Sequence, residues 1–255
     1  LQYQFFQNAL IIAILASLAA GIIGTYIVVK RMSLISGSIA HAAFGGLGIS
    51  YFLNANPLIG GVVFSLVSAV SIAIFKKKAG NRLDTLLSFI WATGMAIGLV
   101  FMFLTPGYAT DLFTYLFGNI LLVSKIDLMM ILVLDIVILA TVFLMFNSFL
   151  SVTFDEEYSE TRNMSVTMVN MILFGLIALT IVATIRVVGV VLMIAILTIP
   201  AATAQLFHKT VKKIMITSSI ITLFATITGL YISYYLDFAP GPIIGELGQV
   251  GIIAS

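Results

Sequence analysis

Apolar runs of about 20 residues divide the chain, and this pattern constrains the fold more than any other feature of the sequence. A helix needs about 20 residues to cross the roughly 30 Å hydrocarbon layer of a membrane. The layer offers no water to backbone groups, so a single crossing segment must be helical. Eight such runs are predicted to span, at residues 8–29, 37–53, 57–75, 86–105, 128–150, 165–185, 188–206 and 214–236.

Composition agrees with this interpretation, since 61% of the residues are hydrophobic and only 9% are charged, against about 25% charged in ordinary soluble domains. The sequence therefore predicts an all-α polytopic membrane protein, with residues 1–255 as a single transmembrane domain. The apolar part between Thr105 and Asp127 is too short to span, and we expect a short re-entrant helix there.

Basic residues set the expected orientation. If the N-terminus lies outside, all of the 12 Lys and Arg residues except Lys125 and Arg186 fall in inner loops, as the positive-inside rule requires. We therefore expect a multi-pass protein of the cytoplasmic membrane, with both termini extracytoplasmic.

Several function classes are excluded by what the sequence lacks. The absence of cysteine excludes disulfides and thiolate metal sites. The net charge of +2 is too small to suggest binding to nucleic acid. Neither a GxxxxGK[ST] loop nor an HExxH or GxSxG pattern occurs. We expect a protein that does not hydrolyse ATP by itself, is not an enzyme and holds no permanent cofactor.

One histidine lies inside the second apolar run, in "SGSIAHAAFGGLGISY". At helical spacing, Gly37, His41, Gly45 and Gly48 share one stripe, with Gly46 beside it. Small residues allow a neighbouring helix to approach closely, so the stripe is predicted to face protein. A buried imidazole at membrane depth either lines a pathway or binds a metal, or else it bonds a facing helix and serves packing only.

Four segments in order carry a resemblance to a known family: "SGSIAHAAFGGLGISY", "FGNILLVS", "FDEEY" and "RVVGVVLMIAILTIPAATA". Together they resemble the permease subunit of manganese, zinc and iron ABC importers, the ABC-3 family. The resemblance implies a homodimeric permease that binds a cytoplasmic ATP-binding subunit. It also implies that an extracytoplasmic binding protein delivers a divalent metal ion as the transported substrate.

The chain departs from the family pattern at Gly37, where many members have an aspartate one helical turn before the histidine. Such a pair would form a two-ligand clamp on one helix face. Three explanations remain open: the carboxylate comes from elsewhere, the ion passes without residence, or the substrate differs. Asp135, inside the fifth predicted span, is the candidate substitute; it would complete a site with His41, pair with a residue such as Asn170, or lie nearer the interface.

The segment "FDEEYSETRN" corresponds by resemblance to the loop that couples the permease to the ATPase. Its candidate coupling residues are Asp155, Glu156, Glu157, Tyr158 and Asn163. The family commonly has glycine where Asn163 stands, and asparagine is the next best residue for a left-handed turn. Pro200 is predicted to kink the seventh span.

These features predict a permease that passes Mn²⁺, Zn²⁺ or Fe²⁺ into the cytoplasm, driven by a separate ATPase. An ion-coupled secondary transporter using Asp135, or an ABC permease for a metal chelate such as a siderophore or cobalamin, is the alternative. A membrane-embedded enzyme would need convergent catalytic groups, and only His41 and Asp135 qualify.

Overall fold

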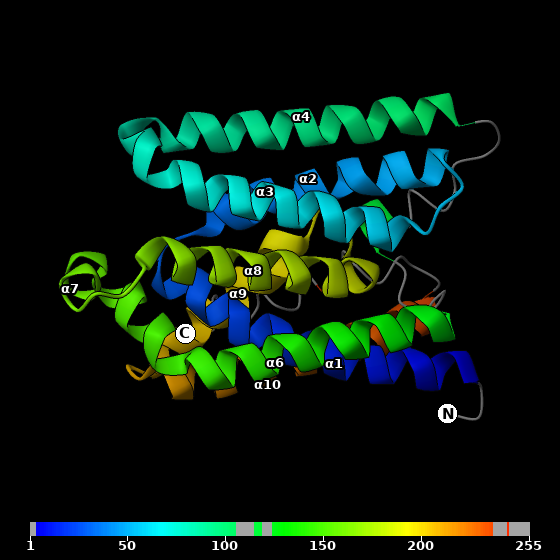
Figure 1. The fold of residues 1–255 in the computed structure, drawn as a ribbon. Helices are drawn as coiled ribbons and strands as arrows, with labels where there is room; N and C mark the ends of the chain where they lie inside the picture. The colour runs from blue at the N-terminus through cyan, green and yellow to red at the C-terminus, as the bar shows by residue number, and fades with distance from the viewer. Residues whose placement is uncertain (1–3, 106–114, 119–123, 237–243, 245–255) are drawn as a thin grey trace. The chain divides into compact units, whose positions relative to one another are not determined.

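The computed structural model describes residues 4–105, 115–118, 124–236 and 244, and the ordered elements within these ranges are all helical (Figure 1). Eight helices of 15 to 30 residues follow the predicted spans in order, which confirms the all-helical fold. They are α1 (Gln4–Val29), α2 (Ser33–Phe52), α3 (Pro57–Ala79), α4 (Leu83–Leu104), α6 (Lys125–Phe154), α8 (Val166–Val188), α9 (Met193–Phe207) and α10 (Val211–Leu236). Two short elements, η1 (Gly80–Arg82) and α7 (Glu156–Thr161), lie between them.

Six of the described helices are long and apolar enough to cross a membrane. α9 is a shorter apolar helix of 15 residues. α2 is not in the set of six, because serines, glycines and a histidine interrupt its apolar residues. The re-entrant helix expected between residues 105 and 127 falls mostly outside the described residues.

The chain divides into two compact units. The first contains residues 1–28, 113–136 and 183–255, and the second contains residues 29–112 and 137–182. The single domain expected over residues 1–255 stays a prediction.

In the first unit, α1 packs closely against α9 and α10. Gly21 lies against the backbone of Ser219 in α10, and Gly24 lies against the carbonyl of Leu197 in α9. The hydroxyl of Ser17 also bonds that of Thr226, at 3.3 Å. Small residues on α1 therefore allow backbone contact along this helix.

Two glycines join distant segments of the first unit. Gly118 has φ +75° and Gly189 has φ +81°, a left-handed conformation that glycine adopts without steric cost. The backbone N–H of Val190 donates to the carbonyl of Tyr115 at 2.9 Å. A Cβ at Gly118 would lie 2.5 Å from the carbonyl carbon of Val188, so the start of the "FGNILLVS" segment packs on the turn between α8 and α9.

In the second unit, α2 packs along both α3 and α4, whereas α3 and α4 contact each other much less. The turn into α3 is defined by local chemistry: Asn54 is left-handed at φ +54°, and Asn56 Oδ1 accepts a bond from the N–H of Leu58 at 3.0 Å. Pro57 follows as the first helical residue, where its missing N–H costs nothing.

Candidate functional site

The glycine stripe of α2 lies at backbone contact with its neighbours. A Cβ at Gly45 would lie 2.8 Å from the carbonyl oxygen of Gly94 in α4, and one at Gly48 would lie 2.7 Å from that of Gly98. Gly46 lies against the backbone of Gly60 in α3. The second unit therefore leaves no room for side chains at these three positions of α2.

Gly37 and the flanking serines are buried at the start of α2. The Ser38 hydroxyl lies 2.9 Å from the carbonyl of Leu34 and 3.0 Å from that of Leu87 in α4. The Ser36 hydroxyl donates to the carbonyl of Ser33 at 2.8 Å. Both hydroxyls therefore donate to backbone carbonyls. Gly37, which lies between them, has no side chain that could supply a carboxylate.

His41 is buried, with 9% of its surface exposed, and it packs on α4. Its ring stacks on Trp91 with centroids 4.2 Å apart, and its Nδ1 lies 3.4 Å from the sulfur of Met95. A thioether is only a weak acceptor. A neutral imidazole that donates from Nδ1 to Met95 keeps Nε2 as an unprotonated ligand nitrogen.

The sequence interpretation missed Trp91 and Met95. They lie four residues apart on α4, hence on neighbouring turns of one face. The Gly94-xxx-Gly98 pair, typical of a helix contact, was the available signal that this helix packs closely on another.

Asp135 is 1% exposed, and neither of its carboxylate oxygens has a hydrogen-bond partner among the described residues. The Asn170 side chain bonds Lys30 and Glu156, and since Asn170 belongs to the second unit and Asp135 to the first, the alternative pairing of the two stays a prediction. His41 belongs to the second unit and Asp135 to the first, and a joint site of the two stays a prediction. Within the described part of the chain, no group of three or more His, Cys, Asp or Glu residues is placed to hold a metal.

The acidic segment forms the short helix α7. Asp155 caps it, because its Oδ1 accepts a bond from the N–H of Tyr158 at 2.8 Å. Ser159 is fully buried, and its hydroxyl lies 2.8 Å from that of Ser151 near the end of α6. Asn163 ends the segment at φ +58°, in the left-handed conformation that the residue type favours.

Three donors converge on one oxygen of Glu156 at the start of α7. The Nζ of Lys76 in α3 donates to Oε1 at 2.6 Å, and the Nζ of Lys30, in the turn after α1, lies 2.9 Å away. The Nδ2 of Asn170 in α8 donates to the same atom at 3.3 Å. Lys30 also donates to Asn170 Oδ1 at 2.6 Å. We call these four residues the Glu156 cluster; it joins α7 to α3, to α8 and to the turn between α1 and α2.

The charges of the Glu156 cluster support one another. Burial alone would raise the pKa of Glu156, but the hydrogen bonds and charges of Lys76 and Lys30 outweigh it and lower the pKa to about 2. At Lys30, whose side chain is 7% exposed, burial dominates and lowers the pKa of the ammonium despite the nearby carboxylate. The hydrogen bond and the charge of Glu156 act against this shift and favour the charged form of Lys30.

The opposite face of α7 is exposed. Tyr158 is 54% exposed, and Glu157 is exposed beside it. The Cζ of Arg162 lies 6.0 Å from the centre of the Tyr158 ring, at the outer limit of a cation–π contact. α7 thus has one face fixed to the second unit and one face that presents an aromatic ring and carboxylates to its surroundings.

Pro200 lies inside α9 and is buried in the first unit, with Ala201, Thr203 and Ala204 buried beside it. A proline inside a helix removes one backbone hydrogen bond. Pro200 belongs to the first unit, whereas His41 and α7 belong to the second.

The model of the ABC 3 transport family matches residues 2–253, and the chain belongs to that family. It is therefore a multi-pass membrane protein. Within that family it is a permease subunit of the metal (manganese) ABC transporters.

Relatives cover nearly the whole chain. An uncharacterized membrane protein of Synechocystis sp. is 41% identical over all 255 residues and 91% of its own length. The manganese transport system membrane protein MntC of Listeria monocytogenes is 32% identical over 94% of this chain and 86% of its own. Among solved structures, PsaBC from Streptococcus pneumoniae in complex with Fab matches with a TM-score of 0.90 and 32% identity, covering 99% of this chain and 91% of that one.

Proposed function

We propose that this protein is the permease of an importer that passes a divalent transition metal ion into the cytoplasm, with Mn²⁺ as the first candidate. A separate ATP-binding subunit drives the transport, and an extracytoplasmic binding protein delivers the ion. The observation that carries the choice of metal is the 32% identity, over 94% of the chain, to a protein named for manganese transport.

The Glu156 cluster supports a coupling role for α7. A helix that receives force from a partner must be attached to the elements that it moves. Glu156 bonds α7 to α3 and α8, while Tyr158 and Glu157 remain available to a partner. We assign the exposed face of α7 to the ATP-binding subunit, so that closure of that subunit on ATP moves the helices attached to Glu156.

His41 supports a path through the second unit. It offers one imidazole nitrogen beside the soft sulfur of Met95. A transported ion must bind well enough to enter and weakly enough to leave, which favours few ligands. We assign His41 as the first path residue, with the glycine stripe holding α2 in place around it.

Asp135 is the second path residue of the proposal. A buried carboxylate at membrane depth costs about 2.5–3.5 kcal/mol by insertion scales, and no hydrogen bond in the described residues offsets this cost. An ion that passes this carboxylate would supply the missing partner. The complete path would form between two copies of the permease.

The test is uptake of radiolabelled Mn²⁺ into vesicles that hold the complete transporter. His41→Ala is expected to lower ATP-driven uptake at least tenfold, because loss of one ligand worth about 1.4 kcal/mol has this effect. His208→Ala is the matched control, since the chain has two histidines and His208 lies at the end of α9. Its uptake should equal that of the wild type.

Two results would contradict the proposal. Mn²⁺ accumulation without nucleotide would favour an ion-coupled secondary transporter. Uptake of a metal chelate but not of the free ion would favour a chelate permease.

A further inference from the structure

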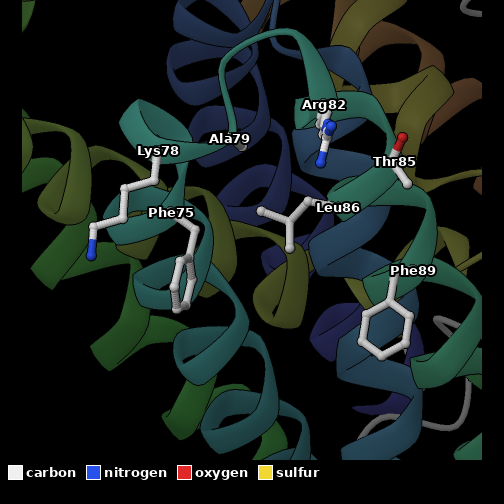
Figure 2. Close-up of a pocket in the computed structure, with 7 residues that line it drawn as sticks. All are labelled: Phe75, Lys78, Ala79, Arg82, Thr85, Leu86 and Phe89. Carbon is white, nitrogen blue, oxygen red and sulfur yellow. The ribbon is translucent and has the colours of Figure 1, made fainter.

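A groove opens between α3 and α4 where the two helices approach their connecting turn, with a volume of about 470 Å³. Both helices pack along α2 but little on each other, so their facing surfaces separate. Figure 2 shows Leu86 of α4 between two aromatic rings, Phe75 of α3 and Phe89 of α4. Arg82 lines the groove at the turn, and Lys78 lines it beside Phe75, with a side chain that Figure 2 shows extending away from the turn.

The apolar part of the groove is uncovered. Phe75 is 48% exposed and Phe89 is 66% exposed. Both belong to the apolar stretches of spanning helices, a few residues from their ends. These two rings would therefore contact the acyl chains of the membrane.

The basic part is also uncompensated. Lys78 and Arg82 are exposed, and neither forms an ion pair with another residue in the described part of the chain. The cations lie one or two helical turns from the exposed aromatic rings. A phospholipid has the complementary arrangement, since its phosphate lies at the membrane interface and its acyl chains lie below it. A free phosphate ion would use the cations and leave the rings uncovered.

The groove lies at the same end of the second unit as α7, because Lys76, two residues before Lys78, bonds Glu156. By the positive-inside rule, this end faces the cytoplasm. The inner leaflet carries anionic lipids, to which juxtamembrane Lys and Arg residues are attracted.

We propose that the groove between α3 and α4 binds an anionic phospholipid, such as phosphatidylglycerol, from the inner leaflet. Lys78 and Arg82 hold the phosphate, and an acyl chain lies on Leu86 between Phe75 and Phe89. This site is independent of the metal that is carried and of the residues assigned to its path.

The test is native mass spectrometry of the delipidated transporter, titrated with phosphatidylglycerol or with phosphatidylcholine of the same chains. Each basic contact near a membrane surface is worth about a fivefold factor, so phosphatidylglycerol is expected to bind at least about fivefold more tightly. Lys78→Gln with Arg82→Gln should reduce the ratio to about one. The matched control removes Lys212 and Lys213, an exposed basic pair at the start of α10, and should keep the preference.

A second variant separates a lipid from a free anion. Phe89→Ser removes part of the apolar wall and is expected to weaken phosphatidylglycerol binding several-fold. If Phe89→Ser has no effect and inorganic phosphate displaces the lipid, the groove is an anion site and the proposal is wrong. It is equally wrong if both lipids bind alike, if the Lys78 and Arg82 variant keeps the preference, or if the ATP-binding subunit displaces the lipid by occupying the groove.

Discussion

Glu156→Gln tests the coupling proposal most directly. The change keeps the size of the side chain and removes its charge, so the Nζ atoms of Lys30 and Lys76 face a neutral amide instead of a carboxylate. Both atoms lie within 2.9 Å of Oε1 in the wild type. Glu157→Gln is the matched control, since Glu157 is the exposed neighbour on the same helix.

The expected cost follows from the burial of each contact. A hydrogen bond to a charged group contributes about 1.5–3 kcal/mol, and a neutral one contributes about 0.5–1.5 kcal/mol. The Lys30 side chain is 7% exposed, so this contact should lose about 1–2 kcal/mol. Lys76 is 25% exposed, and its screened contact should lose about 0.5 kcal/mol or less. We therefore expect Glu156→Gln to destabilise the protein by about 1–2.5 kcal/mol.

Thermal unfolding in nanodiscs measures the stability, and the number of ATP molecules hydrolysed per transported ion measures the coupling. Glu156→Gln should lower the unfolding temperature and raise the ATP cost of each ion, because α7 moves with less effect on α3 and α8. Glu157→Gln should leave the unfolding temperature unchanged. If the two variants are equally stable and equally coupled, the Glu156 cluster does not transmit force.

Three further predictions concern the second unit. The pKa of Glu156 lies at about 2, below its ordinary value of 4.5, so its ion pairs stabilise fully above about pH 4.5 and less as the pH falls toward about 2; the stability difference between wild type and Glu156→Gln should shrink over that interval in chemical unfolding. Gly45→Ala should destabilise by about 1–3 kcal/mol, since its Cβ would lie 2.8 Å from the oxygen of Gly94, whereas Gly61→Ala meets an ordinary 3.4 Å contact and should cost little in the same assay. Asn163→Ala should cost about 1 kcal/mol at its positive φ, and Asn163→Gly should cost nothing, by thermal unfolding.

Sequence reasoning found what depends on neighbours along the chain. Apolar runs predicted the long helices, and the order of four short segments identified the family, because both signals lie within single stretches. The left-handed turn at Asn163 was also visible, since it depends on the residue type.

Contacts between distant segments were not predictable in the same way. Helical spacing placed His41 on the buried face of α2, but it did not identify Trp91 and Met95 on α4, because periodicity orders residues within one helix only. Lys76 lies 80 residues before Glu156 along the chain, and Lys30 lies farther still. Only the folded structure brings these groups to one oxygen.

The contact of α2 with α3 and α4 through glycine has a mechanical consequence. Backbones that touch have no side chains between them that could change rotamer and absorb a displacement. The three helices would therefore turn as one rigid body, and bending would concentrate in the turn that precedes α2, where Arg31 has a left-handed backbone at φ +55°. A displacement of α7 would pass through Glu156 and Lys76 to α3 and then to α2 and α4, because backbone contacts leave no side chains between these helices to absorb it.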